Sequence, residues 1–113
     1  MSHEKYNECI EVCNECAVVC DHCATECLHE KDVNMMARCI ELDRMCADAC
    51  RAAVAAMSKG SEFSGEFCKI CAKVCKVCGD ECAKYKHMQH CKECAETCYR
   101  CAELCREMVG AGV

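Results

Sequence analysis

Residues 8–27 read ECIEVCNECAVVCDHCATEC, and successive cysteines in this stretch are 4, 3, 4, 3 and 4 residues apart. This spacing is the a/d pattern by which one face of a helix packs into a helical bundle. Most other positions carry charged or small side chains, as expected for a helix that is buried on one side only. The stretch therefore predicts an amphipathic helix whose buried face is made of cysteine.

The same pattern returns twice, as CKICAKVCKVCGDEC at residues 68–82 and CKECAETCYRCAELC at residues 91–105. A fourth stretch, RCIELDRMCADAC at residues 38–50, carries only three cysteines. We expect hydrocarbon side chains to fill the rest of its inner face: Met35, Leu42, Ala49 and Ala53. A second apolar line beside that face is either an oligomer contact or part of the core: Met36, Ile40, Ala47 and Val54.

Four segments rich in Glu, Lys, Ala and Arg favour helices, at about residues 4–29, 33–58, 63–85 and 88–108. Their short connections force consecutive helices to run antiparallel. The sequence predicts an all-α fold, an up-down-up-down four-helix bundle with a cysteine-lined core, formed as one domain over residues 1–113. Three residues suit helix ends: Asp32 and Ser64 as N-caps of the second and third helices, and Gly60 as the stop of the second.

Composition narrows the classes of partner. The chain has 113 residues, 19 of them Cys, and a net charge of −5. It has no basic patch that fits nucleic acid, and charges interrupt every apolar run before it reaches the length of a membrane span. The first residues lack the basic and apolar segments of a secretory leader. We therefore expect a soluble, cytoplasmic protein with neither a nucleic-acid nor a membrane partner.

Three explanations for so many cysteines fit poorly. Cysteine is too small to fill a seam that Leu and Ile normally occupy, so a purely structural role would leave a loosely packed interior. Disulfides between residues three or four apart on one helix have unsuitable geometry, and an odd total leaves one thiol unpaired. The ferredoxin run of iron–sulfur proteins needs two consecutive steps of three, which the chain lacks.

Metal binding by thiolates remains, with zinc and Cu(I) as the main choices. Structural zinc sites need four sulfurs that converge, which we do not expect of thiols along straight helices. Cu(I) accepts two or three sulfurs, and two cysteines four residues apart lie over the same patch of a helix. Eight such CxxxC pairs occur: Cys9 with Cys13, Cys16 with Cys20, Cys23 with Cys27, Cys46 with Cys50, Cys71 with Cys75, Cys78 with Cys82, Cys94 with Cys98, and Cys101 with Cys105.

Charge favours Cu(I) independently. Ionised groups are costly in a low-dielectric core unless they are neutralised there. A zinc ion held by four thiolates keeps a net negative charge, whereas thiolates that bridge Cu(I) ions approach one positive charge per sulfur. We therefore predict that many Cu(I) ions fill the core.

Soft ligands also gather at one end of the predicted bundle, where the first and third connections meet. These residues are His29, Met35, Met36, His87, Met88 and His90. Thioether and imidazole groups both bind copper. We predict that copper enters here; the alternative is that the methionines fill the core while the histidines are solvated. We assign His3 and His22 to the surface.

The cysteine-rich stretches, together with KHMQHC at residues 86–91, make the chain resemble the bacterial copper storage proteins over essentially its whole length. The resemblance implies a homotetramer of four-helix bundles of the cytosolic branch, each storing many Cu(I) ions with His and Met near the open end. It implies that all nineteen cysteines are ligands: those of the eight pairs with Cys39, Cys68 and Cys91.

Two other functions are weaker fits. A thiol oxidoreductase usually places CxxC at the start of a helix that follows a strand, and no βαβ pattern occurs here. A chaperone that delivers single copper ions needs far fewer than nineteen thiols. We therefore expect a non-enzymatic protein for copper storage or detoxification.

Overall fold

Four long α-helices build the part of the chain that the computed structural model describes, residues 4–112. They are α1 (Asn7–Cys27), α2 (Ala37–Ser58), α3 (Ser64–Cys82) and α4 (Gln89–Gly110). Short 3-10 turns add Glu4–Tyr6 before α1, Val33–Met36 before α2 and Ala83–Tyr85 after α3. Each helix thus lies within a few residues of its predicted bounds.

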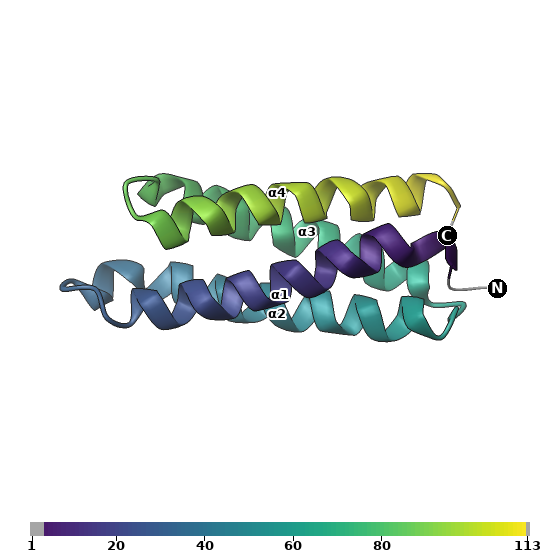
Figure 1. Ribbon diagram of the computed structural model, residues 1–113, viewed down its shortest axis with the longest axis horizontal. Coiled ribbons are helices and arrows are strands. Elements are labelled where there is room, and N and C mark those ends of the chain that lie inside the picture. The colour runs from purple at the N-terminus through teal and green to yellow at the C-terminus, as the bar shows by residue number, and fades with distance from the viewer. Residues whose placement is uncertain (1–3, 113) are drawn as a thin grey trace.

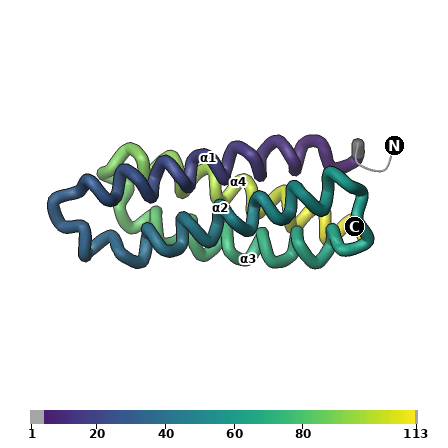
Figure 2. Tube along the Cα trace, turned by 90° about the horizontal axis from the view of Figure 1, so that it is seen from below, coloured from purple at the N-terminus to yellow at the C-terminus, as the bar shows by residue number. Residues whose placement is uncertain are grey.

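The helices form an elongated antiparallel bundle of 48 × 19 × 17 Å (Figure 1). Helices α1 and α3 each pack against both α2 and α4, which places α1 and α3 on one diagonal. The α1–α2 and α3–α4 connections share one end of the bundle, and the α2–α3 connection lies at the other (Figures 1 and 2). We call the first the histidine end, because His29, His87 and His90 lie in or beside its two connections. We call the second the Met57 end, because Met57 lies beside its connection. The predicted four-helix bundle is confirmed.

Two of the three predicted helix-end residues act as expected. The Asp32 carboxylate accepts the Met35 backbone N–H at 3.3 Å and so caps the 3-10 turn that leads into α2. Gly60 has a φ of 62°, the left-handed conformation that ends many helices. The prediction for Ser64 is wrong: its buried hydroxyl has no hydrogen-bond partner, and Ser61 instead accepts the Phe63 backbone N–H at 3.0 Å. Ser64 already lies in the first turn, and its hydroxyl points into the packed interior.

The inner face of α2 differs from the prediction. Asp43 is fully buried there, four residues after Cys39 and three before Cys46, so a carboxyl group occupies a seam position. Met35 was expected on this face but is exposed, because it belongs to the 3-10 turn before α2. Leu42 and Ala49 are only half-buried, since they lie at the edge of the seam, while Ala53 is fully buried as expected.

The second apolar line of α2 belongs to the core rather than to an outer surface. Met36 and Ala47 are buried, and Ile40 and Val54 pack against the core from its edge. Other large apolar side chains of α2 and α3 are exposed, and we refer to them together as the α2–α3 face. They are Met45 of α2, Phe63 just before α3, and Phe67, Ile70 and Val77 of α3.

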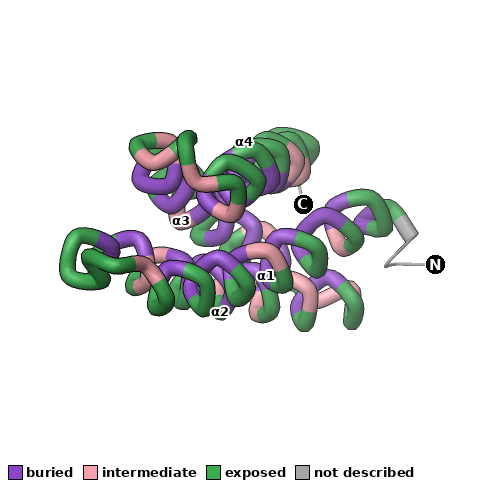
Figure 3. The backbone as a smooth tube through the Cα atoms, turned by 60° about the vertical axis from the view of Figure 1, so that its left-hand side comes forward, coloured by how far each residue is buried: buried purple, intermediate pink, exposed green. Residues whose placement is uncertain are grey.

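Burial follows the inward sides of all four helices (Figure 3). The interior is mostly thiol and alanine, and its largest fully buried side chains, Met36 and Met57, lie near the two ends. Within residues 4–112, none of the helices combines the length and apolar character needed to cross a membrane.

Candidate metal centre

All nineteen cysteines lie inside the bundle as free thiols. Cys9, near the start of α1, has an exposure of 2%, and each of the others is fully buried. The a/d register explains this placement, because every cysteine falls on the stripe that faces the bundle axis. The sulfur atoms therefore form one continuous column along the interior.

Thiols from different helices approach one another closely. The Sγ atoms of Cys46 and Cys75 are 3.4 Å apart, those of Cys39 and Cys82 are 3.5 Å apart, and those of Cys9 and Cys105 are 3.6 Å apart. Contacts within one helix fall in a similar range, from 3.7 Å between Cys71 and Cys75 to 4.0 Å between Cys23 and Cys27. Four of the eight predicted CxxxC pairs make such a contact: Cys16 with Cys20, Cys23 with Cys27, Cys71 with Cys75, and Cys94 with Cys98. The structure adds cross-helix partners that spacing along one helix does not reveal.

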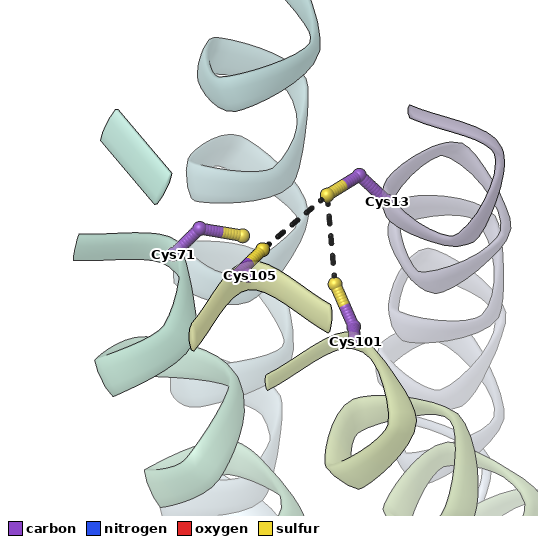
Figure 4. A group of neighbouring side chains, drawn as sticks. All are labelled: Cys13, Cys71, Cys101 and Cys105. Carbon is purple, nitrogen blue, oxygen red and sulfur yellow. Dashed lines mark hydrogen bonds between the residues drawn. The ribbon is translucent and has the colours of Figure 1, made fainter. Parts of the chain in front are cut away.

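Sulfurs also converge in groups of four. Figure 4 shows one such quartet, in which Cys13 Sγ lies 3.6 Å from Cys101 Sγ and 3.7 Å from Cys105 Sγ, with Cys71 alongside. The sequence-based expectation that thiols on straight helices do not converge is therefore wrong. Each helix alone spreads its thiols along a line, but four lines facing one axis bring sulfurs together from several sides. Other four-residue groups are Cys16, Cys46, Cys50 and Cys75; Cys16, Cys20, Cys46 and Cys98; and Cys20, Cys78, Cys94 and Cys98.

Three of these quartets are linked by shared sulfurs. Cys16 and Cys46 belong to two of these groups, and Cys20 and Cys98 also belong to two. A mononuclear tetrahedral site needs four thiolates of its own, so adjacent quartets cannot each hold a separate zinc ion. Thiolates that bridge two metal ions have no such conflict. The shared sulfurs therefore favour a soft metal with bridging ligands, and this argument takes the place of the expectation that the thiols do not converge.

Asp43 places a carboxyl group in the middle of the sulfur column. Its Oδ1 lies 3.2 Å from Cys78 Sγ, 3.3 Å from Cys94 Sγ and 3.5 Å from Cys82 Sγ, each of which can donate an S–H. Burial, followed by the neighbouring thiols Cys94, Cys78 and Cys39, raises the pKa of Asp43 to about 11. The carboxyl group is therefore neutral in the metal-free protein at neutral pH. Continuing the 4, 3 register past Cys39 would have located it from sequence.

Burial also favours the neutral form of a thiol, because an unpaired thiolate is costly in a low-dielectric interior. Burial, together with the charges that Cys39 and Cys91 would carry, raises the pKa of the Cys27 thiol above its ordinary range. The buried polar and charged residues among those described are Asp43, Ser64, Glu81 and Thr97, so the interior holds no cationic side chain. Any thiolate formed there must be neutralised by the ion that it binds.

His90 is the predicted end ligand that reaches the sulfurs. Its Nδ1 lies 3.5 Å from Cys91 Sγ and 3.6 Å from Cys23 Sγ, and together with Cys27 these residues form a fifth ligand group. Its Nε2 lies 3.0 Å from a carboxylate oxygen of Glu30, a residue that sequence reasoning did not single out. His90 and Glu30 are 60 positions apart, so only the fold brings them together.

The remaining predicted end residues are not gathered into one ligand group. His29, Met35 and His87 are exposed, and the His29 ring nitrogen Nδ1 bonds the Thr25 backbone carbonyl at 3.0 Å. Met88 packs against the core from its edge, and Met36 is fully buried within it. The structure thus places three side chains on the outside of the histidine end and three within or against the core.

Known proteins match this chain closely. The family model described as Copper storage protein matches residues 2–110. An uncharacterised cysteine-rich protein of Bacillus subtilis is 49% identical over 106 residues, covering 93% of this chain and 97% of its own.

Solved structures of copper storage proteins also match this chain. The Cu(I)-bound copper storage protein 3 of B. subtilis superposes with a TM-score of 0.88 at 46% identity, covering 92% of this chain and 97% of its own. A cytosolic copper storage protein of Streptomyces lividans holding five coppers superposes with a TM-score of 0.91 at 38% identity, covering 96% and 95%. The chain belongs to the copper storage protein family.

Proposed function

We propose that the protein stores many Cu(I) ions on the thiolates of its core, as one copper-binding domain over residues 1–113. The continuous sulfur column carries this proposal, because cross-helix separations such as 3.4 Å between Cys46 and Cys75 allow one ion to join two sulfurs. Shared quartets let thiolates such as those of Cys16 and Cys46 serve two ions. The Cu(I)-bound Bacillus structure and the copper-containing Streptomyces structure support the same cargo.

Charge balance explains why Cu(I) suits this interior. A thiol that loses its proton gains one negative charge, and each Cu(I) ion brings one positive charge. Loading therefore exchanges a proton for a copper ion at each sulfur, and the core stays close to neutral throughout. A divalent ion cannot fill the column in this way without leaving unequal charge in a low-dielectric space.

The proposed role is storage or detoxification without catalysis, located in the cytosol. The sulfurs serve as ligands and the stored ion leaves chemically unchanged, so no catalytic step is required. The Streptomyces relative, which is described as cytosolic, supports this location.

We also propose a homotetramer, as the family resemblance implies. The α2–α3 face supports it, since it exposes several large apolar side chains, among them Phe63 at 55% and Ile70 at 56%. Apolar surface of this kind favours a contact with another protein chain. Sedimentation analysis of Ile70→Lys tests the proposal: we expect smaller assemblies, and an unchanged mass would contradict a contact through this face.

Metal analysis tests the storage function. The protein is isolated anaerobically from cells grown with added copper and, in parallel, with added zinc. We expect copper to exceed zinc by a wide margin in the first sample, with many copper ions per chain. Zinc as the main metal in both samples would contradict the proposal.

A further inference from the structure

Glu30 lies in the connection after α1 and faces the imidazole of His90 at the histidine end. Its backbone N–H bonds the Cys27 carbonyl at 3.2 Å, which fixes the chain directly above the last cysteine of α1. The Glu30 side chain is 33% exposed, whereas that of His90 is only 11% exposed. The carboxylate therefore covers the imidazole on the side that faces the solvent.

The two sides of the His90 ring have different partners. Nε2 faces Glu30 at 3.0 Å, while Nδ1 faces the thiols of Cys91, Cys23 and Cys27 at 3.5, 3.6 and 3.8 Å. A carboxylate only accepts hydrogen bonds, so Nε2 must carry the proton in this contact. In the neutral ring, Nδ1 then keeps a lone pair, and that lone pair points at the sulfurs.

We infer that Glu30 is a positioning residue for copper uptake, which holds His90 in the Nε2–H tautomer with Nδ1 aimed at the Cys23, Cys27 and Cys91 thiols. This inference rests on the proposed function, because it takes His90 as a copper ligand. Glu30 itself does not contact the thiols in the structure; it acts through the imidazole.

Fixing the ring in advance lowers the cost of binding. A free imidazole can protonate either nitrogen and can rotate about its side-chain bonds, so only part of its population offers Nδ1 to an ion at the sulfurs. Histidine ligands in other metal proteins commonly donate their second nitrogen to a carboxylate, and loss of such a partner typically weakens metal binding by about 10- to 100-fold. We expect removal of the Glu30 carboxylate to weaken copper binding by about 10-fold, near the lower limit of this range, because three thiols remain at the site.

The tautomer is tested without copper. Long-range proton–nitrogen NMR spectra of the metal-free, reduced protein distinguish the two tautomers and the doubly protonated ring, and His90→Ala identifies the His90 signals. We expect wild type and the control Glu26→Ala, an exposed glutamate one turn earlier, to hold the Nε2–H form. Glu30→Ala should give a mixture, and Glu30→Gln should recover most of the Nε2–H form because its amide oxygen accepts the same bond. A doubly protonated ring in wild type, or an unchanged tautomer in Glu30→Ala, would overturn the inference.

Copper binding supplies the second readout. Competition with a coloured Cu(I) chelate measures the affinity for the first equivalents in wild type, Glu30→Ala, His90→Ala and the double variant. We expect Glu30→Ala to weaken this affinity about 10-fold in the wild-type background and to have no effect in the His90→Ala background. Equal weakening in both backgrounds would mean that Glu30 acts through its charge rather than through His90, which overturns the inference. A wild-type capacity of only a few ions would instead contradict the proposed storage function while leaving the tautomer result intact.

Discussion

Replacement of Asp43 by Asn should make the metal-free protein more stable at neutral pH. Asp43 is fully buried among the Cys78, Cys82 and Cys94 thiols, and burial raises the pKa of Asp43 to about 11. In the unfolded chain the same carboxyl group loses its proton near its ordinary pKa of about 4. Between these values the folded state binds one more proton than the unfolded state. The free energy of unfolding therefore falls as the pH rises through this interval.

The structure gives the size of this effect. One proton changes the free energy of unfolding by about 1.4 kcal/mol per pH unit, which amounts to about 4 kcal/mol between pH 4 and pH 7. Asn has nearly the same shape as a protonated Asp and does not titrate, so Asp43→Asn should lack this slope. The variant should match wild type at pH 4 and exceed it by several kcal/mol at pH 7.

Urea unfolding of reduced, metal-free protein, followed by circular dichroism from pH 4 to pH 8, measures the difference. Unfolded cysteines begin to ionise near the upper limit, but this contribution is common to wild type and variant and cancels in their difference. Asp48→Asn on the exposed side of α2 is the matched control, and it should run parallel to wild type. A constant difference between Asp43→Asn and wild type across the pH range would refute the reasoning, because it would mean that the buried carboxyl group does not hold its proton.

Three further outcomes follow from the same structure. The metal-free protein should already be helical by circular dichroism, and copper should raise its melting temperature because the ions bind only the folded state; coil-like spectra before loading would contradict a preformed bundle. Replacing the exposed His29, Met35 and His87 by Ala should slow copper uptake from a Cu(I) chelate, measured by stopped flow, and should leave the final copper capacity almost the same. Unchanged uptake rates would place the entry port at the Met57 end, near Met108. Cys16→Ser with Cys20→Ser should lower the capacity measured at saturation, since both sulfurs belong to the interior quartets, and a capacity equal to that of wild type would exclude them as ligands.

The sequence was sufficient for the helices and for the burial of the cysteines, because both depend on local periodicity. The 4, 3 spacing needs no tertiary information, and it placed Cys9 to Cys27 on one inward stripe. Contacts between helices were not accessible in this way, since axial register and rotation decide which thiols meet. The quartet of Cys13, Cys71, Cys101 and Cys105 draws on three helices, and the contact of His90 with Glu30 joins a loop to the start of α4.

Asp43 is a different case. The cysteine spacing predicts a buried position for it, but an aspartate at that position suggests exposure to solvent. An aspartate in the middle of a helix suggests a solvated face, and Leu42 beside it suggests that the seam is interrupted. The register nevertheless continues from Cys39 through Asp43 to Cys46, and burial follows the register. The exposure of Met35 was misjudged for a related reason: the helical periodicity was extended into a segment that forms a 3-10 turn.

Anaerobic titration with Cu(I) against a coloured chelator tests the central claim most directly. Thiolates that bridge ions and neutralise the core predict saturation near one ion per thiolate, about 15 to 20 Cu(I) per chain. Saturation at four or five ions would indicate separate four-sulfur sites, and it would contradict the storage of copper along the whole sulfur column.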